Sequence, residues 1–230
     1  MAKTLADIKF IAIEGGDGSG KATQAEILRK YFAEVKGKDV LKISFPRYGQ
    51  DSAYYTQEYL NGTYGSADNV PADLASLAYS LDRFAAKDEI LSHLDKPNSI
   101  VIADRYVASN LAHQGTKFSS AKERHAYYER DMKTEYGIFG IPKPDINIVL
   151  LVPTDTMQKN VDKKSARNYT DKKRDIHEAN ASHLERAKSN YQELCEIYPN
   201  EFVPVNCVDK DGEMRSIDDI QQDIRNILGA

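Results

Sequence analysis

The chain alternates between short apolar runs and longer amphipathic stretches. Five runs, each mostly apolar and rich in Ile and Val, cover Ile8–Ile13, Val40–Phe45, Ile100–Ala103, Ile146–Val152 and Phe202–Val205. Runs that are apolar on both faces are typical of strands in a parallel sheet, because helices cover both sides of such a sheet. The stretches between the runs are then crossover helices. The pattern predicts a single α/β domain around a five-stranded parallel sheet flanked by helices.

The amphipathic stretches predict five helices. They cover Lys21–Val35, Pro71–Leu94, Ser120–Tyr136, His177–Tyr198 and Ile217–Leu228. The second of them has Pro71 and Asp73 in its first turn, which favours helix entry. The apolar stripe of this helix consists of Leu74, Leu77, Ala78, Leu81 and Phe84.

Length and charge exclude several classes of protein. The chain has 230 residues and a formal net charge of −4, which argues against a general nucleic-acid binder. Its apolar runs fall far short of the roughly 20 residues of a membrane helix, and Met1–Lys9 lacks the apolar core of a signal peptide. Two cysteines, Cys195 and Cys207, are too few for a disulfide framework or a zinc site. We therefore expect a cytoplasmic protein with reduced thiols.

The clearest motif follows the first predicted strand. The run Gly15-Gly16-Asp17-Gly18-Ser19-Gly20-Lys21-Ala22-Thr23 fits the pattern G-x-x-x-x-G-K between a strand and a helix. Glycines let successive backbone N–H groups point into one concavity, and the helix adds the positive end of its dipole. Lys21 supplies a mobile charge for the β- and γ-phosphates. We predict that these nine residues bind the phosphates of ATP.

The residue after the lysine departs from the pattern. A Ser or Thr normally ligates Mg²⁺ there, but the methyl group of Ala22 cannot bind a metal. Either Thr23 compensates, or Mg²⁺ is held by phosphates, waters and another carboxylate. The candidate is Asp104, which ends the strand Ile100–Ala103 where a Walker-B-type acid belongs. The alternative role for Asp104 is a structural salt bridge to the next residue, an arginine.

Further motifs make the chain similar to the thymidylate kinase family. In chain order they are Glu14–Gln24, Phe45–Gly49, Tyr79–Arg83, Asp104–Asn110, Pro142–Asp145 and Asp175–Glu178, within a resemblance that extends from Ile8 to about Leu228. The resemblance implies a P-loop NTPase fold and the phosphorylation of dTMP to dTDP by ATP-Mg²⁺, a step of dTTP biosynthesis. It also implies small nucleotides as partners, rather than nucleic acid or a membrane, and a homodimer.

Two pairs of residues suit nucleotide binding by their spacing. Tyr79 and Arg83 lie four residues apart and share a helix face away from the apolar stripe. An aromatic ring and a guanidinium one turn apart can stack a base and grip a phosphate. Asn110 and Gln114 have the same spacing, and with Ser109 they offer donors and acceptors for the edge of a pyrimidine.

The resemblance assigns roles to these and other positions. It implies that Tyr79 stacks on the base, that Arg83 clamps the acceptor phosphate, and that Arg105 bridges the donor and acceptor phosphates. His113 stands where many family members carry Tyr beside the sugar, so deoxyribose selection stays open. The remaining implied acceptor-site residues are Asp17, Phe45, Arg47, His177 and Glu178.

One segment differs from the rest of the chain in charge. Met157–Asp175 holds seven basic and three acidic residues, a local charge of +4, whereas the other 211 residues carry −8. Such a window by itself is most often a solvated face. Family members with a neutral residue at the position of Gly18 supply an arginine from a mobile lid. The resemblance therefore implies a lid at about 157–175 that closes over ATP, with Arg167 or Arg174 as a catalytic residue.

Two alternative functions stay open. One is a kinase for another deoxynucleoside monophosphate, and the other is a nucleotide-binding regulatory protein that has lost catalysis, as Ala22 would allow. Lys21, Arg83 and Arg105 argue against the second alternative because they retain the charges that phosphoryl transfer needs. In the predicted mechanism Lys21, Arg105 and a lid arginine neutralise charge around a loose, in-line transition state, so positioning and electrostatics supply most of the acceleration.

Overall fold

A computed structural model describes residues 8–162 and 181–230 of the chain. Within them, one parallel sheet has the strand order β2-β3-β1-β4-β5. The strands are β1 (Phe10–Gly15), β2 (Asp39–Ser44), β3 (Ser99–Asp104), β4 (Ile146–Leu151) and β5 (Phe202–Asn206). The five predicted strands and their parallel arrangement are thus confirmed. The register pairs Ile13 with Asp104 and Gly15 with Leu150, so the carboxyl ends of β1, β3 and β4 meet at one edge, where α/β proteins bind ligands.

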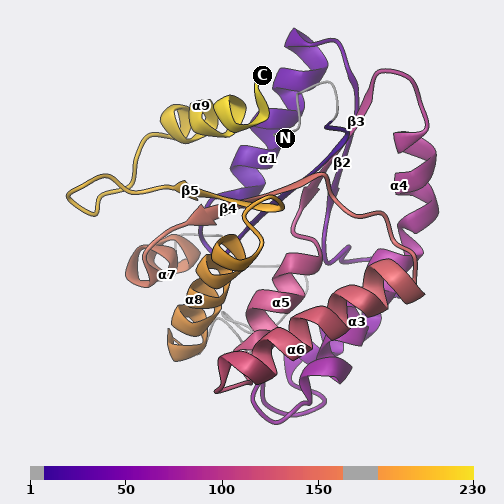
Figure 1. Cartoon of the computed structure of the whole chain (residues 1–230), viewed down its shortest axis with the longest axis vertical. Coiled ribbons are helices and arrows are strands. Elements are labelled where there is room, and N and C mark those ends of the chain that lie inside the picture. The colour runs from indigo at the N-terminus through magenta and orange to yellow at the C-terminus, as the bar shows by residue number, and fades with distance from the viewer. Residues whose placement is uncertain (1–7, 163–180) are drawn as a thin grey trace.

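Helices cover both faces of this sheet (Figure 1). On one face lie α1 (Lys21–Lys30) and α9 (Ile217–Leu228). On the other lie α5 (Val107–Gly115), α6 (Ala121–Met132) and α8 (Ala181–Ile197). Strand β1 serves both cores, because Ile11 and Ile13 pack with α1 and α9 whereas Phe10 and Ala12 pack on the opposite side. Its apolar character on both faces follows from this position.

The helices differ from the sequence expectation in several places. The helix predicted over 71–94 is two helices, α3 (Ala72–Ala85) and α4 (Lys87–Leu94), separated at the buried Ala86. The helices α1 and α6 continue as π-helical turns, η2 (Tyr31–Val35) and η4 (Lys133–Ile138). Elements absent from the prediction are η3 (Asp51–Ala53), α2 (Tyr54–Asn61), α5 and α7 (Thr154–Asp162). The start of the predicted helix 177–198 lies outside the described residues, and α8 confirms the remainder.

The apolar stripe of α3 points away from the core. An apolar helix stripe ordinarily packs inward, but Leu74 is 59% exposed and Leu77, Leu81 and Phe84 are exposed as well. The inward face instead carries polar side chains, all nearly fully buried, from Ser76, Ser80, Asp82 and Arg83. The three leucines and the phenylalanine of the predicted stripe therefore lie on the surface of this chain, whereas its Ala78 and the polar face lie in the interior.

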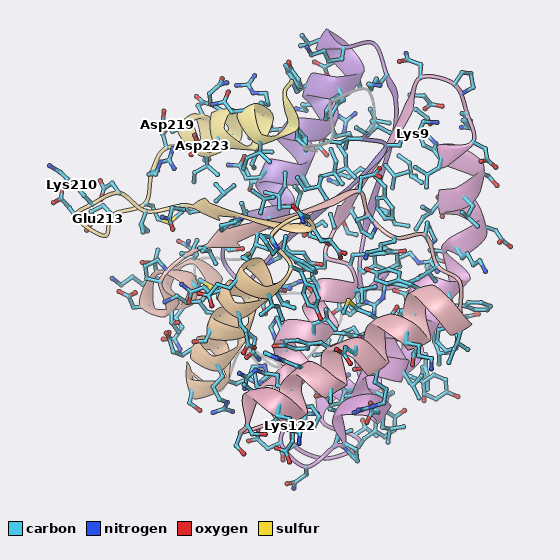
Figure 2. The ribbon with its side chains drawn as sticks, in the orientation of Figure 1. Lys9, Lys122, Lys210, Glu213, Asp219 and Asp223 are labelled. Carbon is cyan, nitrogen blue, oxygen red and sulfur yellow. The ribbon has the colours of Figure 1, made fainter. Side chains whose placement is uncertain are left out.

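Charged side chains mark the outer edges of the molecule. Lys210 and Glu213 project from the loop between β5 and α9, and Lys122 projects from the outer side of α6 (Figure 2). No helix in residues 8–162 or 181–230 combines the length and the apolarity that a membrane crossing requires. Cys195 and Cys207 are free thiols.

Candidate active site

The predicted phosphate loop joins the end of β1 to the start of α1. Gly15, Gly18 and Gly20 have φ values of 139°, 83° and 91°, which L side chains rarely adopt. A Cβ atom at Gly18 would lie 2.3 Å from the carbonyl oxygen of Met157 in α7, and one at Gly16 would lie 2.4 Å from the sulfur of that residue. The loop is thus packed closely on α7. At Gly18 the backbone of Met157 and the positive φ leave room only for glycine, whereas the neighbour of Gly16 is a flexible side chain.

Lys21 folds back over the loop. Its side chain is buried, and its Nζ donates to the Gly16 carbonyl oxygen at 2.7 Å and to Ser19 Oγ at 3.5 Å. The ammonium group therefore lies beside the loop, at the N-terminus of α1. A helix N-terminus with a nearby cation favours bound phosphate.

Arg105 lies across the mouth of this loop. It forms an ion pair with Asp17, and its Nη1 donates to the Gly15 carbonyl oxygen and to Ser109 Oγ, each at 3.2 Å. Its backbone has a φ of 68°, in the left-handed region that non-glycine residues seldom occupy. Residues held in such strained conformations cluster at functional sites. Asp17 comes from one motif and Arg105 and Ser109 from another, and the fold brings the three together.

A buried carboxylate supports Arg105 from below. Glu14 is fully buried and accepts hydrogen bonds from the Tyr106 backbone N–H at 2.6 Å, from Ser109 Oγ at 2.8 Å and from Tyr191 Oη at 3.1 Å. Burial raises the pKa of Glu14, and the hydrogen bond from Ser109 and the charge of Arg105 oppose that rise. Sequence reasoning assigned no role to Glu14, although an acidic residue inside an apolar strand was the available signal.

Asp104 lies at the end of β3, next to the phosphate loop in the sheet register. Its carboxylate is partly exposed and forms no hydrogen bond or ion pair with the described residues, so the alternative salt bridge to Arg105 is not formed. Ala22 and Thr23 are exposed on the first turn of α1. Among these residues Asp104 offers a carboxylate and Thr23 a hydroxyl, both oxygen ligands that Mg²⁺ accepts, whereas Ala22 offers none.

Arg83 and Asn110 meet beneath the site on a second buried carboxylate. Arg83 donates to Glu135 from Nε at 2.7 Å and from Nη2, and from Nη1 to the Tyr106 carbonyl oxygen at 3.4 Å. Asn110 Nδ2 donates to the same Glu135 at 3.0 Å. Burial tends to lower the pKa of Arg83, but the charge of Glu135 raises it above its ordinary value. Sequence reasoning did not identify Glu135.

Tyr79 and Gln114 are linked through Tyr59 of α2. The rings of Tyr59 and Tyr79 meet edge to face with centroids 6.1 Å apart, and Tyr59 Oη donates to Gln114 Oε1 at 3.3 Å. These residues come from α2, α3 and α5. The predicted stacking aromatic and the predicted polar edge therefore belong to one connected group.

Arg47 is anchored to α3. It donates to Asp82 from its backbone N–H at 2.6 Å and from Nε at 2.9 Å, and from Nη2 to Ser52 Oγ at 3.0 Å. Its guanidinium lies 5.9 Å from the centre of the ring of Phe45, which is buried. Asp82 thus fixes the loop after β2 against the polar face of α3.

His113 pairs with a histidine of α8. Its Nδ1 lies 3.2 Å from Nε2 of His183, and the two rings stack. Burial, followed by the charge of His183, holds the pKa of His113 well below its ordinary value. Burial likewise lowers the pKa of His183 to about 4. Both rings are therefore neutral at pH 7, and the pair joins α5 to the helix that follows the predicted lid.

Part of the predicted site falls in the undescribed segment. Arg167, Arg174, His177 and Glu178 lie outside the described residues. Positions 157–162 of the predicted lid are helical in α7, and Asn160 Nδ2 donates to the Gly18 carbonyl oxygen at 3.0 Å. The chain that leads into residues 163–175 therefore starts directly against the phosphate loop.

Comparison with known proteins gives a consistent picture. The family model described as thymidylate kinase matches residues 13–219. The thymidylate kinase of Mycobacterium tuberculosis is 34% identical over 188 residues, which are 80% of this chain and 85% of that protein. A probable thymidylate kinase of Thermococcus gammatolerans is 27% identical over 229 residues, 95% of each chain.

Solved structures share the fold. The thymidylate kinase structure from Candida albicans aligns with a TM-score of 0.70 at 21% identity, covering 96% of this chain and 91% of that one. The structure from Ehrlichia chaffeensis aligns with a TM-score of 0.63 at 18% identity, covering 96% and 98%. At these identities the likeness concerns the order and packing of the elements.

Proposed function

The chain belongs to the thymidylate kinase family, enzymes that phosphorylate dTMP to dTDP, and we propose that it does so with ATP-Mg²⁺ on the phosphate loop. The observation that carries this proposal is the meeting of two groups at one sheet edge. The phosphate loop with Lys21 lies on one side, and the polar face of α3 with Asn110 lies on the other. Arg105 and Asp17 lie between them.

Each group has a role in this proposal. Gly15 to Thr23 bind the phosphates of ATP, and Lys21 and Arg105 neutralise the charge that develops on the transferring group. Asp17 holds Arg105 and faces the acceptor hydroxyls. Tyr79 stacks on the base, whose edge meets Asn110 and Gln114. The acceptor phosphate attacks in line, without a side-chain nucleophile, so positioning provides most of the acceleration.

The residues present fit a Mg²⁺ ion. The carboxylate of Asp104 is partly exposed, forms no bond within residues 8–162 and 181–230, and lies beside the loop that binds the phosphates. Asp104 would hold the ion, alone or together with the hydroxyl of Thr23, and Ala22 contributes no ligand. Mg²⁺ would neutralise charge on the phosphate oxygens.

Most of the predicted lid, residues 163–175, lies outside the described residues, and its role is proposed from the sequence. We propose that Arg167 or Arg174 reaches the phosphates, because Gly18 supplies no side chain and α7, which precedes this segment, contacts the loop through Met157 and Asn160. Replacing both arginines by Ala is expected to lower kcat far more than dTMP affinity. An unchanged kcat would contradict the lid.

The homodimer is proposed to form through the outward face of α3. Its exposed leucines, with Tyr55 and Tyr64 of the preceding segment, line an apolar groove of about 360 Å³. Contiguous apolar surface of this kind marks a partner site, and one helix face can pair with its own copy about a two-fold axis. Sedimentation of the purified chain should give twice its mass of 25.8 kDa; a monomer at micromolar concentration would contradict the dimer.

A panel of nucleoside monophosphates tests the reaction. ADP release is measured with ATP, Mg²⁺ and dTMP, dUMP, dCMP, dGMP or dAMP, and dTMP is expected to turn over fastest. Fastest turnover of dCMP, dGMP or dAMP would contradict the dTMP assignment. ATP binding without turnover would favour the nucleotide-binding regulatory protein. Lys21→Ala should lower kcat at least about a hundredfold, whereas Lys122→Ala, at the exposed surface of α6, should not.

A further inference from the structure

Two carboxylates lie one helical turn apart beneath the acceptor side of the site. Asp131 is a buried residue near the C-terminal end of α6, and Glu135 is the buried residue of η4, four positions later. Glu135 is 0% exposed and Asp131 is 5% exposed. Charged side chains are almost never this buried unless they are paired.

Glu135 holds two residues of the candidate acceptor pocket at once. Its Oε2 accepts from Arg83 Nε at 2.7 Å. Its Oε1 accepts from both Arg83 Nη2 and Asn110 Nδ2, the latter at 3.0 Å. A single carboxylate oxygen therefore connects α3 with α5. Bidentate contacts of this kind fix the plane of a guanidinium as well as its position.

The contact also fixes the orientation of the Asn110 amide. Its Nδ2 has two hydrogens, and both are used, one by Glu135 Oε1 and one by the Ser76 carbonyl oxygen at 3.2 Å. The polar atom left for a ligand is Oδ1, which can only accept. A half-turn of the amide would place Oδ1 against the carboxylate of Glu135, and two acceptors repel. Glu135 thus allows one orientation of Asn110.

An acceptor at this position distinguishes among bases. Thymine and uracil carry an N3–H that can donate to Oδ1, whereas N3 of cytosine has a lone pair and cannot. Sites that hydrogen-bond a substrate N–H reject analogues without it, because a polar group is then left unpaired. Arg83, whose charge Glu135 already balances, contributes directed N–H groups rather than a free positive charge.

We propose that Glu135 is a positioning residue for base selection, which fixes Asn110 as an acceptor toward the acceptor base, while its ion pair with Arg83 holds the carboxylate in place. This inference rests on the proposed function. It adds to that function a residue outside the pocket lining that determines which monophosphate the pocket accepts.

The test compares Glu135→Gln with Glu193→Gln as a matched control. Glu193 is also paired with an arginine through two bonds, from Arg124 Nε at 2.6 Å and Nη2 at 2.7 Å. Within residues 8–162 and 181–230, it forms no hydrogen bond or ion pair with a candidate acceptor residue. Steady-state kcat and KM are measured for dTMP, dUMP, dCMP and ATP, and circular dichroism checks folding. In Glu135→Gln the KM for dTMP should rise at least about tenfold and the dTMP-to-dCMP ratio of kcat/KM should fall about as much. In Glu135→Gln the KM for ATP should stay within about twofold of the wild-type value. In the control Glu193→Gln, the KM for dTMP and the dTMP-to-dCMP ratio of kcat/KM should also stay within about twofold of the wild type.

A folded Glu135→Gln variant with the wild-type dTMP-to-dCMP ratio would overturn the inference. In a background of Asn110→Ala, the same substitution should leave the remaining ratio unchanged, because Glu135 acts through Asn110. A further large fall in the dTMP-to-dCMP ratio in the Asn110→Ala background would also overturn the inference, since it would indicate that Glu135 has a merely structural role.

A measurement on the unchanged enzyme covers the case in which the variant does not fold. The 3-methyl derivative of dTMP lacks the N3–H, and we expect at least a hundredfold loss in its kcat/KM relative to dTMP. Equal turnover of the two would overturn the inference. Absence of wild-type turnover on dTMP itself would instead overturn the proposed function, so the two failures are distinguishable.

Discussion

The two faces of α3 invert the usual arrangement of an amphipathic helix. Outward lie Leu74, Leu77, Leu81 and Phe84, and inward lie Ser76, Ser80, Asp82 and Arg83. Ordinarily the leucines would pack in the core and the charges would meet water. The inward face contacts candidate site residues from other segments, and the outward face is the surface on which the homodimer is proposed to form.

The inward face is stable because each of its charges has a partner. Asp82 accepts from Arg47, and Arg83 donates to Glu135. Buried ion pairs add little net stability, but removing one partner leaves an uncompensated charge and costs far more. The outward face has no such requirement, because exposed apolar side chains need no partner within the chain. The two faces should therefore respond oppositely to substitution.

Arg83→Met should have the largest effect, because it breaks the inward face. It leaves Glu135 buried beside Asp131 with no positive charge between them. We expect a loss of about 3–5 kcal/mol in the free energy of unfolding, measured by urea denaturation, together with loss of dTMP turnover. Arg124→Met is the control, because its partner Glu193 is part-exposed and also accepts from His125 and Tyr128. Equal losses in the two variants would contradict the distinction between paired charges inside and at the surface.

Leu77→Glu should break the outward face without harming the fold. A charge at the centre of the proposed dimer contact should weaken association more than about a hundredfold, measured by analytical ultracentrifugation. The free energy of unfolding of the monomer should change by less than about 1 kcal/mol, because Leu77 is exposed there. Val35→Glu is a control on another exposed apolar residue, in η2, and should leave the association unchanged. A Leu77→Glu variant that still forms the dimer would contradict the proposal that the outward face of α3 is the dimer contact.

The inversion explains what the sequence could and could not predict about α3. The period of its leucines predicted a helix and a stripe correctly. Periodicity cannot say which side of a helix meets the core, because that depends on what the rest of the chain presents. The break at Ala86 was equally hidden, since neither glycine nor proline marks it.

Much of the candidate site was predictable because its residues are close in sequence. Gly15 to Lys21 form one continuous loop, and the strand before it is apolar on both faces. Glu135 was not predictable, because it lies 52 positions from Arg83 and meets it only after α6 packs against α3. Glu14 gave a signal, a charge within an apolar strand, but its partners Tyr106 and Tyr191 come from distant segments.

Asp131→Asn should change how the free energy of unfolding depends on pH. Burial, followed by the neighbouring charge of Glu135, raises the pKa of Asp131 to about 7. Between about pH 4 and pH 7 the unfolded chain therefore releases a proton that the folded chain keeps, so the wild type loses stability as the pH rises. Relative to the wild type, the variant should gain more than about 1.4 kcal/mol between pH 5 and pH 8 in urea denaturation, the equivalent of one pKa unit.

The control for this pH effect is Glu193→Gln. Hydrogen bonds from Arg124 lower the pKa of Glu193 to about 2. Glu193 is therefore ionised in both the folded and the unfolded chain between pH 5 and pH 8, and its variant should differ from the wild type by a constant amount over that window. Parallel stability curves for Asp131→Asn and the wild type would contradict the raised pKa.

The smallest effects should separate two serines on the same buried face. Ser76 Oγ lies 2.7 Å from Tyr127 Oη, which itself donates to the Asn110 carbonyl oxygen, so Ser76→Ala removes a bond between helices and should cost about 1 kcal/mol. Ser80 Oγ donates at 2.8 Å to the carbonyl oxygen of Ser76, four residues earlier on its own helix. Such a back-bond adds little to a helix, and alanine is the better helix former, so Ser80→Ala should change the free energy of unfolding by less than about 0.5 kcal/mol. Urea denaturation of both variants at pH 7 measures the difference. Equal costs would mean that burial alone, rather than the partner across the helix interface, determines what a polar side chain contributes on this face.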